Sequence, residues 1–303
     1  MKRVILDVDT GIDDALAITY ALQSPELDVI GLTTCFGNNT IEKTTRNTLA
    51  IVEMAGKSVP VYKGADKPLK RETRDIPTHV HGEDGLGDCP TNEPLGKAED
   101  ENAVDFIIRQ VKQRPNDITL IPVGPLTNLA KAILKAPEII PLFKEVIIMG
   151  GAVFVPGNVT PYSEANIYTD PEAAALVFAS GLPITVVGLD VTMKTLLPEA
   201  VVADWRARGT EKARFFADMT GFYMNAYETF QPGIGGCALH DPLAVGVAID
   251  PDFVKREAWH IEVIVEGDET GRTVASSVGE PKVFVCTDVQ AEAFLHHFVG
   301  RVL

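Results

Sequence analysis

The chain has 303 residues, of which 46% are hydrophobic and 23% are charged, and its formal net charge is −15. This length and apolar content can bury a large core, whereas the negative charge argues against nucleic-acid backbones and anionic membranes as partners. A small neutral or cation-bridged substrate fits better. One domain over residues 1–303 is the simplest organisation, because no Pro-, Gly- or Ser-rich stretch separates balanced halves.

Apolar strand-like runs alternate with amphipathic helical stretches along the chain. We expect strands at residues 2–8, 28–35, 118–123, 145–149, 184–189, 260–265 and 282–286, and helices at 13–22, 41–55, 102–113, 126–136, 171–179 and 241–248. This alternation predicts a single α/β domain with a mainly parallel open sheet flanked by helices on both faces. In such sheets the active site lies at the carboxyl ends of the strands, so the residues after each strand are the first candidates.

Four aspartates crowd the end of the first predicted strand and the start of the next helix: Asp7, Asp9, Asp13 and Asp14. Carboxylates a few ångströms apart repel by roughly 1 kcal/mol per pair in water and by more when buried, so they need a cation or bound protons. Their oxygen ligands, with no Cys or His among them, favour Ca²⁺ or Mg²⁺ over Zn²⁺. The plain alternative is that Asp13 caps the helix and the strand carboxylates are solvated.

Two other acidic motifs compete with this interpretation. An EF-hand loop counted from Asp7 fails at its fifth, sixth and twelfth positions, where Gly11, Ile12 and Ile18 stand. The haloacid dehalogenase-like phosphatases, which use Mg²⁺, remain an alternative because their first strand also ends in Asp-x-Asp followed by a small pair. That alternative gives Asp13 and Asp14 no role.

Polar residues also follow the later predicted strands. Asn38 follows the second strand, and a Gly-Pro-Leu-Thr-Asn turn follows Val123. The loop that contains Asn158, Glu164 and Asn166 offers amides and a carboxylate that can hydrogen-bond a polyol. Turn chemistry and helix capping account for each of these residues taken singly.

Two imidazole positions are further candidates. His240 precedes Asp241 and a proline, which is the pattern of a helix N-cap, but an imidazole beside that carboxylate can donate a proton. His81 lies in a Gly-rich loop that could act as a lid. A single histidine is more often structural or solvated than functional.

Together these segments resemble the nucleoside hydrolases of the inosine–uridine-preferring type, which split nucleosides into ribose and free base. The similarity runs from the first strand to near Leu303 and implies one catalytic domain over residues 1–303. Its strongest marks are residues 7–14, 37–38, 79–82, 124–128, 149–151, 164–167 and 240–242.

The resemblance implies a role for each matching residue. Ca²⁺ would be bound by Asp9, Asp14, Asp241 and the backbone carbonyl of Val123. The ribose would be held by Asp13, Asn38, Met149, Asn158, Glu164 and Asn166. The base would face His81 and His240, and the further candidate base contacts are Phe222, Tyr223 and Tyr227, although aromatic residues at helical spacing are typical of a core.

The chemistry of N-glycoside hydrolysis agrees with these roles. The ribosyl group passes through an oxocarbenium-like cation, which carboxylates stabilise. Ca²⁺ accepts about seven or eight oxygen ligands, so it can hold protein carboxylates, ribose hydroxyls and a water together. We expect that metal-bound water to attack directly with inversion, with Asp9 as general base and His240 assisting departure of the base.

The aromatic and histidine residues of the motif segments indicate which base the enzyme prefers. Trp205 and Trp259 lie outside the motif segments, whereas purine-specific relatives sandwich the base between Trp rings. The pair His81 and His240 instead resembles the pyrimidine-preferring and base-tolerant groups. Ala165 stands where many relatives carry Phe, and this smaller side chain either widens the expected pocket or holds the substrate less tightly. A catalytically silent riboside-binding relative is the remaining alternative.

Four widely spaced cysteines without a CxxC pattern predict reduced thiols: Cys35, Cys89, Cys237 and Cys286. With no signal peptide in view, we expect a cytoplasmic enzyme of nucleoside salvage and purine or pyrimidine metabolism. The resemblance also implies a homo-oligomer, either a dimer or a tetramer.

Overall fold

A computed structural model describes residues 1–276, 278–279 and 283–303. In these residues a nine-stranded sheet has the order β10-β9-β11-β6-β5-β4-β1-β2-β3, and β7 pairs with β8 in a small second sheet. The strands are β1 (Lys2–Val8), β2 (Leu27–Thr34), β3 (Val61–Lys63), β4 (Ile118–Pro122), β5 (Glu145–Met149), β6 (Ile184–Val187), β7 (Leu196–Pro198), β8 (Gly236–Ala238), β9 (Val254–Val263), β10 (Thr273–Ser276) and β11 (Val283–Val289).

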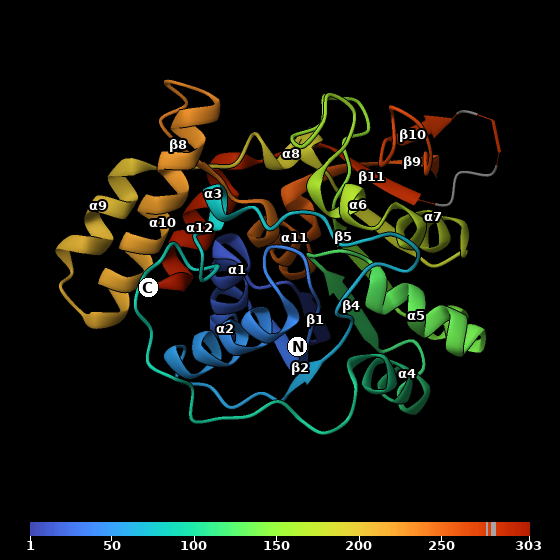
Figure 1. The fold of residues 1–303 in the computed structure, drawn as a ribbon, viewed down its shortest axis with the longest axis horizontal. Coiled ribbons are helices and arrows are strands. Elements are labelled where there is room, and N and C mark those ends of the chain that lie inside the picture. The colour runs from blue at the N-terminus through green and yellow to red at the C-terminus, as the bar shows by residue number, and fades with distance from the viewer. Residues whose placement is uncertain (277, 280–282) are drawn as a thin grey trace.

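Helices cover both faces of the main sheet (Figure 1). They are α1 (Ile12–Gln23), α2 (Ile41–Met54), α3 (Thr78–His81), α4 (Ala103–Gln113), α5 (Thr127–Lys135), α6 (Ala165–Thr169), α7 (Pro171–Ala179), α8 (Leu189–Thr192), α9 (Glu199–Ala207), α10 (Glu211–Phe230), α11 (His240–Ile249) and α12 (Ala291–Val302). In Figure 1, α9 and α10 lie at one end of the molecule and β9 and β10 at the other.

The alternation of side chains along β1 sorts the core into two layers. Val4, Leu6 and Val8 pack in the cluster that includes α1, α2, α11 and α12. Ile5 points to the opposite face, where it joins the cluster of α4, α5 and α7. Because both faces of β1 are covered, the strand is a nearly continuous apolar run, as is typical of a buried parallel strand.

Local capping explains where several helices begin. The Asn102 side chain accepts a hydrogen bond from the Val104 N–H at 2.9 Å and starts α4. Asp170 accepts one from the Ala173 N–H at 3.1 Å, with Pro171 at the first helical position of α7. Both are the N-cap pattern that satisfies the unpaired amides of a first turn.

The chain order reverses around β1. From β1 the chain moves outward to β2 and β3 on one side, and later to β4, β5 and β6 on the other, all through parallel pairs. Only the β11–β9 and β9–β10 pairs within the described sheet are antiparallel. Such a reversal opens a crevice at the carboxyl ends of β1 and its neighbours, where ligands bind in sheets of this kind.

The mainly parallel sheet flanked by helices is confirmed. Two strand predictions need correction: the strand expected at 260–265 runs from Val254 to Val263, and the one expected at 184–189 ends at Val187 because Leu189 begins α8. The last predicted strand starts at Lys282, which lies outside the described residues, and β11 begins at Val283. The unpredicted elements are β3, β7, β8, β10, α3, α6, α8, α9 and α12.

All four cysteines are free thiols, as expected. Among the residues that the structure describes, no helix has the length and apolar content required to span a bilayer.

Candidate active site

Asp9 lies just beyond β1, enclosed by two glycines. A Cβ atom at Gly37 would lie 2.0 Å from Asp9 Oδ2, and one at Gly124 would lie 2.5 Å from Asp9 Oδ1. The Asn38 N–H donates to Oδ2 at 2.8 Å, whereas the buried Oδ1 has no hydrogen-bond partner among the described residues. Glycine at both positions therefore lets the loops after β2 and β4 close on this carboxylate.

Asp14 links the end of β1 to the first turn of α1. Its Oδ1 accepts a hydrogen bond from the Asp9 N–H at 3.1 Å, and its Oδ2 accepts from the Gly11 N–H at 3.0 Å. Asn38 Nδ2 also donates to Oδ2, at 3.1 Å. These bonds and the helix dipole hold a negative charge at the amino end of α1.

The carboxylate of Asp241, at the start of α11, meets the first turn of α1. One oxygen from each of Asp13, Asp14 and Asp241 lies within 4.8 Å of the others, so these residues could hold a metal ion. Burial, followed by the charge of Asp14, raises the pKa of Asp13 to about 8. Burial also raises the pKa of Asp9 and of Asp241 well above the usual value. The site thus needs positive charge to ionise fully at neutral pH.

Asp7 stands apart from this group. Its Oδ1 accepts hydrogen bonds from Thr33 Oγ1 at 2.6 Å and from Asn128 Nδ2 at 2.8 Å, while burial raises the pKa of Asp7 to about 6. Asn128 also donates to the Thr34 carbonyl at 3.0 Å. Asp7 therefore ties β1 to β2 and α5.

Glu164 and Asn166 converge at the carboxyl ends of β4 and β5. Glu164 caps α6: Oε1 accepts from the Asn166 N–H at 2.9 Å, and Oε2 accepts from the Gly151 N–H at 3.0 Å. Asn166 Nδ2 donates to the Val123 carbonyl at 2.7 Å and lies 3.3 Å from Met149 Sδ. These contacts join the start of α6 to the ends of β4 and β5.

Asn158 supports the same loop, since its Oδ1 accepts a hydrogen bond from the Ala165 N–H at 3.1 Å. Asp170, the N-cap of α7, makes two further contacts. Its Oδ2 also accepts from Thr127 Oγ1 at 2.7 Å and from the Leu69 N–H at 2.9 Å.

His81 reaches the site from the short helix α3. Its Nδ1 accepts a hydrogen bond from the Ile12 N–H at 3.1 Å, so that nitrogen carries no proton and the ring is neutral. Burial lowers the pKa of His81 to about 3. The ring stacks on Tyr223 with centroids 5.5 Å apart.

His240 forms a hydrogen-bonded chain with two hydroxyls. Its Nε2 lies 2.6 Å from the Tyr227 hydroxyl and its Nδ1 lies 2.7 Å from Thr192 Oγ1. Burial lowers the pKa of His240 to about 4, which keeps the ring neutral at physiological pH. Of the three predicted aromatic base contacts, Tyr223 and Tyr227 lie beside the two histidines, whereas Phe222 packs against Gly87.

Arg74 and Thr192 have no counterpart in the sequence prediction. The charge of Arg74 acts on the carboxylates of Asp9 and Glu164, although it lies in a loop with no recognisable motif. Thr192 ends α8, and neither periodicity nor spacing relates it to His240.

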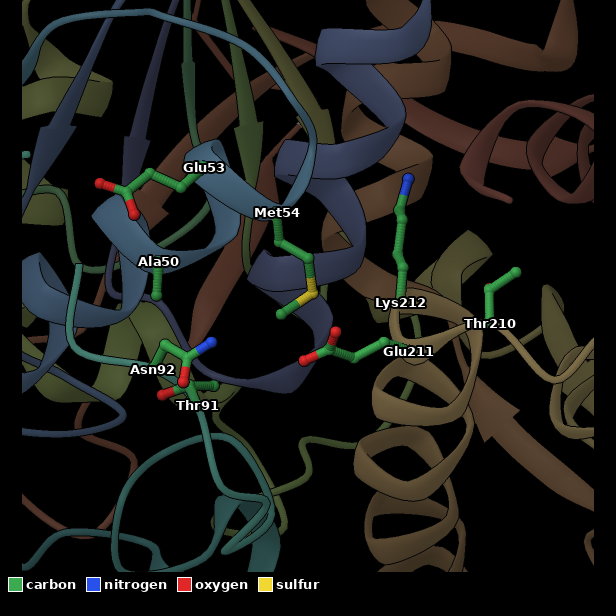
Figure 2. A pocket seen from close by; sticks show the side chains of 8 residues that line it. All are labelled: Ala50, Glu53, Met54, Thr91, Asn92, Thr210, Glu211 and Lys212. Atoms are coloured by element: carbon green, nitrogen blue, oxygen red, sulfur yellow. The ribbon is translucent and has the colours of Figure 1, made fainter. Parts of the chain in front are cut away.

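A separate surface pocket lies between the end of α2 and the start of α10 (Figure 2). It shares no residue with the carboxylate cluster, so it does not contribute to that site. Its lining residues are Ala50, Glu53, Met54, Thr91, Asn92, Thr210, Glu211 and Lys212.

Fold and site together define an α/β protein with a cluster of buried carboxylates, able to hold a cation, at the switch point of a mainly parallel sheet. The model of the inosine-uridine preferring nucleoside hydrolase family matches residues 4–296, and the chain belongs to that family.

Relatives named for different base specificities are similar to this chain. It is 40% identical over 281 residues to a pyrimidine-specific ribonucleoside hydrolase, RihB, of Escherichia coli strain SE11, covering 92% of this chain and 88% of that protein. It is 38% identical over 273 residues to a probable uridine nucleosidase 1 of Oryza sativa subsp. japonica, covering 90% and 84%. The solved structure of a purine-preferring ribonucleoside hydrolase from Gardnerella vaginalis is 44% identical, with a TM-score of 0.96 over 99% of this chain and 98% of that one.

The family predicted from the sequence is therefore confirmed, as is the class of enzyme, a hydrolase that acts on N-glycosyl compounds. The phosphatase alternative gains no support from these relatives. The role of each site residue remains a prediction.

Proposed function

We propose that this protein is a Ca²⁺-dependent ribonucleoside hydrolase that releases ribose and the free base. The observation that carries the proposal is the convergence of Asp13, Asp14 and Asp241 beside Asp9, at the carboxyl ends of the strands. The family membership supports the same reaction.

The acidic cluster fits a hard divalent cation. Buried Asp9 Oδ1 and Asp13 Oδ1 have no hydrogen-bond partner among the described residues, as expected for oxygens directed at a ligand. Every donor is an oxygen, which suits Ca²⁺. In our assignment Asp9, Asp14, Asp241 and the Val123 carbonyl hold the ion, while Asp13 is left for the ribose. When bound, Ca²⁺ supplies the positive charge that keeps these carboxylates ionised and that attracts ribose oxygens.

Asp9 is our general base. The Asn38 N–H fixes one of its oxygens, which leaves Oδ1 to take the proton of an attacking water. The water oxygen bonds to C1′ as the C1′–N bond breaks, so C1′ is inverted and both bond electrons leave with the base. Asp13, Asn38, Met149, Asn158, Glu164 and Asn166 hold the ribose, and the carboxylates among them favour the ribosyl cation.

The departing base needs a proton, and the chain from Thr192 through His240 to Tyr227 can deliver one. If the Thr192 hydroxyl donates to Nδ1, the proton of His240 resides on Nε2 and is donated to the Tyr227 oxygen. The Tyr227 O–H is then free to donate to the base, and His240 replaces the proton. His240 thereby assists departure through Tyr227.

We propose that the enzyme is pyrimidine-preferring or base-tolerant. The stacked rings of His81 and Tyr223 offer a flat face to the base, and His81 offers one N–H group. Tyr227 lies nearby, and nothing in this set of residues demands a purine ring. Phe222 is retained as a further candidate. The relatives do not agree on the base, since one is named pyrimidine-specific and another purine-preferring.

Further proposals concern the whole molecule. Residues 1–303 act as one catalytic domain, supported by strands from both ends of the chain meeting in one sheet. The protein forms a dimer or tetramer, for which the exposed side chains of Phe154 and Tyr162 offer apolar surface. The protein acts in the cytoplasm, in nucleoside salvage, and its free thiols suit a reducing compartment. Light scattering tests the oligomeric state.

A nucleoside panel tests the main proposal. Ribose release from uridine, cytidine, inosine and adenosine is measured by a reducing-sugar assay, with added Ca²⁺ and with chelator. We expect Ca²⁺-dependent release, fastest with the pyrimidine ribosides or similar for all four bases. The Asp14→Asn variant should lose activity, and Asp252→Asn, at an exposed carboxylate, should not.

Other outcomes identify the alternatives. Phosphate release from p-nitrophenyl phosphate without ribose release would favour the phosphatase. Thermal stabilisation by uridine without turnover would favour a silent riboside-binding relative.

A further inference from the structure

The loop between β3 and α3 is fixed on both sides of the active site. On one side, the Leu69 N–H donates to Asp170 Oδ2 at 2.9 Å, and Arg71 pairs with Glu172 at 2.7 Å. On the other side the loop enters α3, where His81 is held by the Ile12 N–H at 3.1 Å. The segment between these anchors, residues 72–77, contains Arg74.

Arg74 lies near enough to the site for its charge to act on Asp9 and Glu164. Its side chain is half-buried, and its Nε is fully buried without a hydrogen-bond partner among the described residues. Burial lowers the pKa of the Arg74 guanidinium, and the charges of Asp9 and Glu164 act in the opposite direction. The same charge also lowers the pKa of His81.

In the part of the chain that the structure describes, the guanidinium of Arg74 is unpaired, in contrast to that of Arg71 in the same loop. Arg71 uses Nε and Nη2 to bind both oxygens of Glu172, at 2.8 and 2.7 Å. Within the described residues Arg74 forms no ion pair, although Asp9 and Glu164 are near enough to influence it. A buried donor on a charged group is costly to leave unpaired, so we expect a ligand to complete it.

The chemistry of the reaction limits where such a cation is useful. A positive charge next to C1′ opposes formation of the ribosyl cation, and the ribose is already surrounded by carboxylates and amides. The departing base receives the electron pair of the C1′–N bond, and negative charge collects on its ring carbonyl oxygens. A planar guanidinium binds such an oxygen well.

Building on the proposed function, we infer that Arg74 is a substrate-contacting catalytic residue whose guanidinium binds a carbonyl oxygen of the base and stabilises the negative charge formed there during bond cleavage. His81 cannot supply this charge, because its Nδ1 accepts a hydrogen bond and its ring is therefore neutral. Tyr227 supplies the proton, and Arg74 stabilises the charge before that proton arrives.

The test compares leaving groups. Arg74→Ala, Arg74→Gln and Arg74→Lys are assayed with uridine and with p-nitrophenyl β-D-ribofuranoside, whose phenolate has no ring carbonyl and leaves readily without help. A hydrogen bond to a charged group is worth about 1.5–3 kcal/mol, so Arg74→Ala and Arg74→Gln should lower kcat on uridine by about 10-fold to 100-fold. The loss on the p-nitrophenyl riboside should be below about 3-fold, and Arg74→Lys should retain part of the uridine activity.

Lys67→Ala is the matched control, since it removes one positive charge from an exposed position of the same loop. It should match wild type on both substrates. Equal losses on both substrates in the Arg74 variants would overturn the inference, because Arg74 would then act on the ribose or on the fold. Unchanged uridine turnover in Arg74→Ala would also overturn it.

A binding measurement separates this inference from the proposed function. If wild type released ribose from no nucleoside, the proposed function would fail, and calorimetry of uridine and of ribose would still test Arg74. Weaker binding of uridine but not of ribose by Arg74→Gln would support contact with the base. An equal weakening of both, or none, would refute it.

Discussion

The packing of Gly124 against Asp9 makes a quantitative prediction. In Gly124→Ala the new Cβ would lie 2.5 Å from Asp9 Oδ1 and 2.9 Å from Asp9 Cγ, where ordinary contact begins at 3.4 Å. Carboxylate and loop must therefore separate by about 0.9 Å. A misplacement of about 1 Å in a reacting group can lower the rate by about 10²-fold, so we expect a fall in kcat of that size.

The assay is steady-state hydrolysis of uridine, combined with thermal unfolding followed by circular dichroism. Overpacking should lower the free energy of unfolding by about 1–3 kcal/mol, which leaves the protein folded at 25 °C. Gly300→Ala is the control: no atom outside the local helix lies within 4 Å of its added Cβ, so kcat should be unchanged and the helix slightly stabilised. A Gly124→Ala enzyme with kcat within about 2-fold of wild type would refute the reasoning that the position of Asp9 is critical.

Three further predictions concern the same site. Asp9→Ala should lower kcat by about 10² to 10⁴-fold, the usual scale for a general base, while ribose affinity measured by calorimetry changes less. Tyr227→Phe removes the hydroxyl 2.6 Å from His240 Nε2, so kcat on uridine should fall by about 10²-fold, whereas turnover of p-nitrophenyl riboside should change little. Because the pKa of Asp13 rises from 3.8 to about 8 on folding, the native state binds more protons than the unfolded state between these values. The titration of Asp13 should therefore make the free energy of unfolding of the metal-free protein fall as pH rises from 4 to 8. The increase in Tm on adding Ca²⁺ should be larger at pH 8 than at pH 5; an equal increase at both would contradict this account.

Elements with a strong local signal could be predicted from the sequence alone. β1, β5 and α7 have the predicted bounds, since each combines an apolar run with clear end signals such as the Asp170–Pro171 cap. β9 was predicted to begin too late in the chain, because its first half contains the charged residues Lys255, Arg256 and Glu257, which are not typical of a strand. β3, β7 and β8 have three residues each and depend on partners distant in the chain.

The residues of the site also divide into those that the sequence could identify and those that it could not. Asp9, Asp13 and Asp14 are close in sequence and could be grouped by spacing, and Asp241 could be added through the family resemblance. Arg74 and Thr192 could not be found in this way, because their proximity to Asp9 and His240 results only from how the loop before α3 and the end of α8 fold back on the sheet.

The acidic cluster unites carboxylates that are translated at very different times. A ribosome must add every residue between Asp9 and Asp241 before the last of these carboxylates becomes available. A nascent polypeptide therefore carries Asp9, Asp13 and Asp14 without their partner and can complete its ion-binding centre only when α11 emerges. Premature termination anywhere before that helix yields a product that lacks part of this centre, so synthesis itself delays the appearance of activity until α11 has been made.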